Sequence, residues 1–150
     1  VERIVSFYHY ILRSPTHYLH DRLRNESIDL RGFVEKQLTL ECDNLQVRYL
    51  CSDDLSGVAI GACTRSMLEQ AKENLASRFA AVGLMERFDQ SLQLTAQRLG
   101  WKKTESPRIN IAAAGTKRKE TDATTLALIK SANELDAELY QFAAEQFAKN

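Results

Sequence analysis

Apolar side chains recur at helical spacing from the first residues of the chain. Ile4, Tyr8 and Ile11 lie three or four positions apart, which predicts an amphipathic helix that runs to about Arg13. Pro15 ends this helix, because it disfavours a helical residue before it and has no N–H to donate.

The pattern then weakens over some fifty residues. Residues 16–26 are polar and irregular, whereas residues 29–38 have the apolar spacing of a short amphipathic helix. Residues 39–63 show no clean period and contain two glycines. We therefore expect a long, partly ordered connection over residues 39–63, of a kind that often contributes to function.

Helix signals return strongly at residue 64. Ser66 and Glu69 have the spacing of a capping box, in which each side chain accepts a hydrogen bond from the other's backbone N–H. The apolar face that follows comprises Met67, Leu68, Ala71 and Leu75. Residues 79–84 are then continuously apolar, which is typical of a buried parallel strand.

A second helical stripe follows this predicted strand immediately. It consists of Met85, Phe88, Leu92, Ala96 and Leu99. Gly100 stands where a helix commonly ends on a left-handed residue. Helix, strand and helix in this order indicate an α/β fold, here mostly helical with one or few parallel strands.

The last third of the chain begins with a basic loop. Residues 101–120 contain six cationic side chains, two carboxylates, a proline and a glycine. Helical character resumes at Asp122, and Ser131 with Glu134 forms a second capping box that predicts the start of the last helix. The apolar positions of that helix are Leu135, Leu139, Phe142, Ala143 and Phe147.

Composition narrows the class of protein. The 150 residues include 20 Lys and Arg against 20 Asp and Glu, and this balance argues against a global electrostatic grip on nucleic acid. The 44% hydrophobic content suffices for a core, and no apolar run reaches the length of a membrane span. The chain has no initiator Met and begins inside a predicted helix, so we expect a partial sequence.

Three segments, in order along the chain, point to one family. Residues 1–10 (VERIVSFYHY) resemble the end of the motif Arg-Asp-Pro-x-x-Arg-x-x-Ser-x-Tyr, which is found in carbohydrate sulfotransferases. Residues 71–75 and 79–89 look like that family's helix, strand and helix. Residues 115–119 (GTKRK), with Asn133-Glu134-Leu135-Asp136 and Leu139-Tyr140, resemble the basic loop and terminal helix of the branch related to uronyl 2-O-sulfotransferases.

The resemblance implies a P-loop-like α/β fold and a reaction. Such enzymes transfer a sulfuryl group from 3′-phosphoadenosine 5′-phosphosulfate to a hydroxyl, usually of a carbohydrate, and no metal is implied. The family's 5′-phosphosulfate loop and its catalytic base would lie before Val1. Residues 1–150 are thus expected to be the C-terminal part of a catalytic domain, with any membrane attachment outside them.

The same resemblance suggests which residues bind the donor's 3′-phosphate. Ser6 falls on the motif's Ser and Arg3 on its second Arg, while Lys117 and Arg118 lie in the Gly-flanked basic loop. A hydroxyl, a guanidinium fork and an ammonium all suit a dianionic phosphate. The alternatives are a tolerated small residue in a helix for Ser6, a surface ion pair for Arg3, and a solvated charge run for Lys117 and Arg118.

Other polar residues give weaker signals. Asn44, Gln46 and Arg48 resemble a polar stretch near the acceptor cleft, and a structural polar network explains them equally well. His17 and His20 could share a helical face, but no further ligand completes a metal site. Cys42, Cys51 and Cys63 lack zinc spacing; a Cys42–Cys51 disulfide and two buried free thiols both remain open.

Two other functions remain open besides sulfuryl transfer. One is a P-loop-like nucleotide-binding phosphoryl transferase, and the other is a non-enzymatic helical domain that contacts a partner protein. The low cysteine content leans toward a bacterial cytoplasm. The Golgi lumen, as part of a type II membrane protein, is the alternative, and Asn25-Glu26-Ser27 is a glycosylation sequon.

Overall fold

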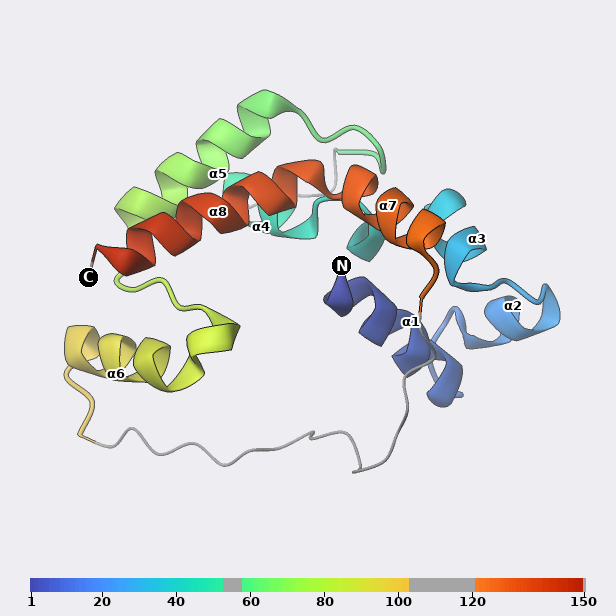
Figure 1. Ribbon diagram of the computed structural model, residues 1–150, viewed down its shortest axis with the longest axis horizontal. Coiled ribbons are helices and arrows are strands. Elements are labelled where there is room, and N and C mark those ends of the chain that lie inside the picture. Colours follow the sequence, from blue (N-terminus) through green and yellow to red (C-terminus); the bar gives the residue numbers. More distant parts are fainter. Residues whose placement is uncertain (53–57, 103–120, 150) are drawn as a thin grey trace.

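A computed structural model describes residues 1–52, 58–102 and 121–149 of the chain. This described part is mostly helical and contains no strand (Figure 1). Two short 3₁₀ turns, η1 and η2, accompany the α-helices. In chain order the elements are α1 (Glu2–Arg13), α2 (His20–Asn25), α3 (Leu30–Glu35), η1 (Leu40–Cys42), α4 (Leu45–Cys51), α5 (Arg65–Arg78), η2 (Met85–Arg87), α6 (Phe88–Leu99), α7 (Ala123–Ala132) and α8 (Glu134–Ala148).

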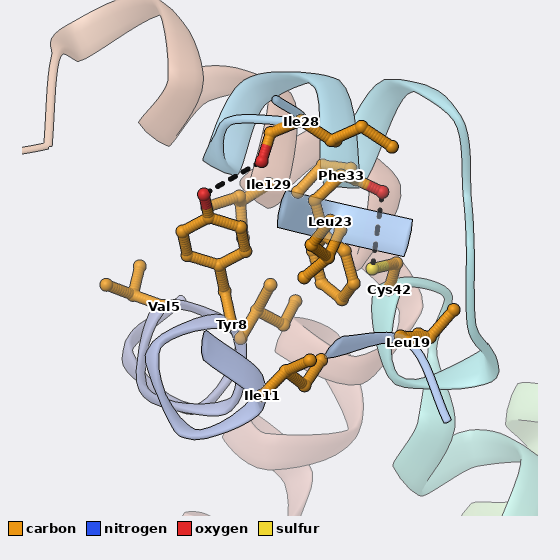
Figure 2. Packing of buried hydrophobic residues seen from close by; sticks show 11 residues of the cluster. Val5, Tyr8, Ile11, Leu19, Leu23, Ile28, Phe33, Cys42 and Ile129 are labelled. Carbon is orange, nitrogen blue, oxygen red and sulfur yellow. Dashed lines mark hydrogen bonds between the residues drawn. The ribbon is translucent and has the colours of Figure 1, made fainter. Parts of the chain in front are cut away.

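The first hydrophobic cluster joins α1, α2, α3 and α7 (Figure 2). Ile11, Phe33 and Ile129 are fully buried in it and come from three different helices. The hydroxyl of Tyr8 donates to the Ile28 carbonyl over 2.9 Å, so this aromatic side chain is buried without an unpaired polar group.

The second cluster joins α4, α5 and α8, which lie side by side in Figure 1. Its buried members are Val47, Leu68, Ala71, Leu75 and Leu139. Ala71 and Leu68 are three positions apart on α5, so a single face of that helix enters the cluster.

A polar junction connects the two clusters at the facing N-termini of α4 and α8. The carboxylate of Asp136, in the first turn of α8, accepts from the backbone N–H groups of Val47 at 2.8 Å and Gln46 at 3.1 Å. In return, the side-chain oxygen of Asn44 accepts from the backbone N–H of Asp136 at 3.0 Å. Each helix thus supplies the N-terminal cap of the other.

Asn133 completes this junction from the break between α7 and α8. Its side-chain oxygen accepts from the Asn44 N–H at 3.1 Å. Its amide nitrogen donates to the carbonyls of Cys42 and Ile129, at 3.1 and 2.9 Å. Asn44 itself has a positive φ of 45°, a left-handed conformation that Asn tolerates better than most residues.

Pro15 and Gly100 predict the C-terminal ends of two helices correctly. α1 ends at Arg13, as the proline at position 15 requires. α6 ends at Leu99, and the next residue, Gly100, has the expected left-handed conformation with a φ of 69°. The predicted helix over residues 29–38 is shorter in the structure, from Leu30 to Glu35, with Asp29 accepting from the Gly32 N–H at 2.8 Å.

Both predicted capping boxes are wrong in their details. The cap of α5 is Thr64, whose hydroxyl accepts from the Met67 N–H, and the helix begins at Arg65. The last helix begins at Glu134, but Ser131 lies inside the last turn of α7. The capping oxygen at that start comes from Asn44 instead, because α8 begins against α4.

The strand predicted over residues 79–84 is not formed in the described part of the chain. Phe79 and Leu84 have extended dihedral angles, yet no neighbouring strand pairs with them. Both backbone polar groups of Leu84 bond the Ser91 hydroxyl of α6 instead, at 2.8 and 2.9 Å. Gly83 permits this close approach, since a Cβ there would lie 2.8 Å from the Cβ of Ser91.

The weakly patterned segments contain more helix than predicted. α2 lies within residues 16–26, and α4 lies within residues 39–63. α4 has only seven residues, a length at which a helix depends on tertiary contacts. Among the described helices, none is both long enough and apolar enough to cross a bilayer.

The reciprocal capping predicts a large effect of a single substitution. Asp136→Ala removes the acceptor of two N–H groups at the start of α4, and we expect a loss of about 2–3 kcal/mol in unfolding free energy. Urea unfolding measures it. Glu145→Ala, an exposed change on the same helix, is the control and stays within about 0.5 kcal/mol. Equal effects of the two substitutions would contradict the capping role.

Candidate functional site

The exposed face of α1 contains two of the predicted site residues. Ile4, Tyr8 and Ile11 turn toward the first cluster, so Arg3 and Ser6 lie on the solvent side, one helical turn apart. The Arg3 guanidinium donates to the Glu41 carbonyl over 3.4 Å. The Ser6 hydroxyl has no hydrogen-bond partner among the described residues, so it is available to a ligand.

Lys117 and Arg118 lie outside the described residues. The structure therefore places Arg3 and Ser6 on one face of α1. That Lys117 and Arg118 lie near this pair stays a prediction.

Arg48 belongs to a buried network that holds the chain together. Its side chain is fully buried and forms an ion pair with the Asp43 carboxylate. The guanidinium also donates to the carbonyls of Asp43, Val58 and Ala59, at 2.9, 2.8 and 2.7 Å. Asp43 in turn accepts from the Gly61 N–H at 2.7 Å. These contacts fix residues 58–61 against α4. They agree with the alternative that Arg48 belongs to a structural polar network.

Asn44 and Gln46 contribute to the junction in different ways. Asn44 is buried, and its side chain bonds Asp43, Ala132 and the N–H of Asp136. Gln46 bonds Asp136 only through its backbone N–H, and its residue is exposed. Of the three residues predicted near the acceptor cleft, Gln46 is thus the one with a side chain accessible to solvent.

The electrostatics of the junction connect it to α1. Burial raises the pKa of the Asp136 carboxyl, while its backbone hydrogen bonds and the positive charge of Arg3 act in the opposite direction. Arg3 therefore lies close enough to influence the junction, although its side chain belongs to the exposed face of α1.

Metal-ligating residues do not gather in the described part of the chain. No group of three His, Cys, Asp or Glu there could hold a metal ion. His20 is buried and bonds Asp21 over 3.0 Å, whereas the Nδ1 atom of His17 accepts from the Leu19 N–H over 3.2 Å. His17 and His20 thus have separate structural partners.

Four rings that the sequence analysis did not connect form a cluster beside the exposed face of α1. Phe7 and Tyr10 come from α1, and His17 and Tyr18 from the turn after Pro15. Two aromatic residues one turn apart, followed by a chain reversal and two more rings, are the signal that could have predicted this cluster. Tyr10 and Tyr18 remain exposed, so the cluster offers aromatic surface to solvent.

A pocket of about 420 Å³ lies elsewhere, between the C-terminal ends of α4 and α5. Its lining residues are Tyr49, Leu50, Cys51, Ser52, Gln70, Asn74, Arg78 and Phe79. Asn74 closes the end of α4 by donating to the Leu50 carbonyl over 2.7 Å. None of the predicted site residues lines this pocket.

No family model, curated protein or solved structure matches the chain. A function is therefore proposed from the resemblance in sequence together with the arrangement of side chains.

The three cysteines are free thiols; Cys42 is buried whereas Cys51 and Cys63 are half-buried, so the alternative of two buried free thiols is correct for Cys42 alone. Cys42 is fully buried, and its Sγ lies 4.0 Å from the Phe33 carbonyl, to which it donates (Figure 2). Burial raises the pKa of this thiol to about 12, with Glu41 and Asp43 adding to the effect.

This raised pKa predicts an alkaline loss of stability. Above an ordinary thiol pKa near 9 the unfolded chain releases the proton, whereas the folded chain keeps it until about 12. The unfolding free energy therefore falls as the pH rises through this window, by up to about 1.4 kcal/mol per pH unit from Cys42. Unfolding in urea at pH 8, 9 and 10 measures the slope. The unfolding free energy of the Cys42→Ala variant should fall less steeply with pH. An identical slope in wild type and variant would contradict the burial of this thiol.

Proposed function

We propose that this chain is part of a sulfotransferase that moves a sulfuryl group from 3′-phosphoadenosine 5′-phosphosulfate to a carbohydrate hydroxyl. The observation that supports it is the exposed pair Arg3 and Ser6 on one face of α1, at the spacing of the resembled motif. In this proposal the chain is the mostly helical C-terminal part of a P-loop-like α/β domain.

The chemistry of the pair suits a phosphate group. Positions i and i+3 of a helix place their Cβ atoms about 5–6 Å apart, so both side chains can reach one phosphate. The Arg3 guanidinium offers a planar fork of donors, and the Ser6 hydroxyl donates a further hydrogen bond. Bonds to a charged group of this kind are roughly twice as strong as neutral ones.

Binding the 3′-phosphate fixes the donor relative to the protein. Sulfuryl transfer is proposed as an in-line displacement at sulfur, in which the acceptor hydroxyl attacks and adenosine 3′,5′-bisphosphate leaves. Arg3 and Ser6 orient the departing group, and Lys117 and Arg118 add positive charge at the same phosphate. No described residue is assigned as the catalytic base, which the proposal places outside these 150 residues.

A second candidate function is a helical domain that binds a partner protein. It is favoured by exposed apolar side chains between residues 79 and 101, namely Phe79, Met85, Phe88, Leu99 and Trp101. In Figure 1 α6 stands apart from α4, α5 and α8. A folded full-length protein with no affinity for adenosine 3′,5′-bisphosphate would favour this second function.

Ser6→Ala tests the proposed phosphate contact directly. Loss of one hydrogen bond to a charged phosphate should weaken binding of adenosine 3′,5′-bisphosphate to the full-length protein about ten- to a hundredfold in calorimetric titration. Ser131→Ala, an exposed serine on α7, is the matched control and leaves the affinity unchanged. An equal affinity of wild type and Ser6→Ala would reduce Ser6 to a helix residue without a role in binding.

The basic loop is tested by a ratio of affinities. Replacing Lys117 and Arg118 together by Ala should remove most of the full-length enzyme's preference for adenosine 3′,5′-bisphosphate over adenosine 5′-monophosphate, because only the former has the 3′-phosphate. A solvated charge run would instead lower both affinities slightly and equally, and salt would screen the loss. The control replaces Lys130 and Lys149 by Ala. If the Lys117 and Arg118 double variant kept the wild-type preference between the two nucleotides, the loop would lie outside the site.

A further inference from the structure

Tyr18 is an exposed ring held in a fixed orientation. It is 73% exposed, and among the large hydrophobic residues that the structure describes only Met85 is more exposed. Its hydroxyl nevertheless donates to Thr39 Oγ1 over 3.3 Å, and one ring face stacks on His17 with centroids 4.7 Å apart. The other face is therefore presented to solvent by a ring whose orientation is already fixed.

His17 is itself fixed from three sides. Its Nδ1 atom accepts from the Leu19 N–H, and Phe7 and Tyr10 meet it edge to face, at centroid distances of 5.6 and 6.0 Å. The protein therefore loses little conformational entropy when a ligand stacks on Tyr18. This preorganisation raises the affinity for the ligand.

A polar rim adjoins the outer edge of Tyr18. The buried Thr39 hydroxyl accepts from Tyr18 and donates to Glu41 Oε2. The hydroxyls therefore point toward the carboxylate. Glu41 Oε1 has no hydrogen bond within the described residues, so it is free to accept one. Arg3 donates to the Glu41 carbonyl and joins this rim to the exposed face of α1.

An aromatic face beside a carboxylate suits a pyranose ring. A sugar presents C–H groups on one face, which stack on an aromatic ring, and hydroxyl groups around its edge, which donate to a carboxylate. A nucleotide could also stack on Tyr18, but its phosphate would meet the negative charge of Glu41.

We infer that Tyr18 and Glu41, which the buried Thr39 hydroxyl links, form a binding subsite for one sugar unit of a carbohydrate. This inference rests on the proposed function, because it assigns the acceptor to a surface that Arg3 connects with Ser6. The subsite binds a sugar unit of the acceptor and takes no part in the transfer itself.

The test uses the 150-residue chain with two probes, cellotetraose and a hyaluronan tetrasaccharide, titrated by NMR. At least one of them should perturb the Tyr18 and Glu41 resonances. Tyr18→Ala should then weaken binding about tenfold, whereas Tyr18→Phe, which keeps the ring, stays within about threefold. Glu41→Gln should weaken it about threefold or more, since a charged acceptor is lost.

Controls separate this subsite from the donor site and from a general loss of structure. Tyr49→Ala, another exposed tyrosine, leaves sugar binding unchanged, and thermal unfolding checks that each variant folds. Tyr18→Ala keeps its affinity for adenosine 3′,5′-bisphosphate, and Ser6→Ala keeps its affinity for the sugar.

Three results would overturn the subsite. They are no binding of either tetrasaccharide, sugar binding that survives Tyr18→Ala, and displacement of the sugar from Tyr18 by adenosine 5′-monophosphate. A separate result would contradict the donor site alone. It is sugar binding at Tyr18 in a protein that does not bind adenosine 3′,5′-bisphosphate.

Discussion

The structure depends on two helices that cap each other. A helix leaves its first N–H groups without partners, and α4 and α8 satisfy this need reciprocally through Asn44 and Asp136. Asn133, between α7 and α8, adds bonds to Asn44 and Cys42 on one side of this junction and to Ile129 on the other. Because the junction lies between two separate hydrophobic clusters, it determines how the first 42 residues and the α4, α5 and α8 cluster are placed relative to each other.

The proposed sites lie close to this junction along the chain and in space. Arg3 contacts the Glu41 carbonyl, which precedes Asn44 by three residues, and the same charge influences Asp136. The packing of Ile4 and Tyr8 inward sets Ser6 outward, so burial in the first cluster determines the exposed face of α1. The apolar spacing of α1 determines how it packs against α2 and α3. This packing in turn leaves an arginine and a serine hydroxyl exposed on the same face.

The sequence predicts the features that depend on neighbouring residues. The C-terminal ends of α1 and α6 follow from Pro15 and Gly100, whereas α6 begins at Phe88 and not at Met85, where the predicted stripe starts. α4 was missed because its cap, Asp136, lies about 90 residues away, and no local pattern shows such a partner. The apolar run at residues 79–84 predicted a strand, but its backbone partner is the Ser91 hydroxyl of the next helix. Arg48 likewise has buried partners at residues 58 and 59 that spacing alone does not reveal.

Amide hydrogen exchange at the junction tests the central claim most directly. The N–H groups of Gln46, Val47 and Asp136 belong to first turns of helices, where exchange with water is normally fast. Reciprocal capping predicts that all three exchange only when the chain unfolds globally, with protection equal to that of Leu68 and Ile129 in the clusters. Exchange of these three groups at the rate of frayed helix ends, in a chain whose clusters stay protected, would contradict it.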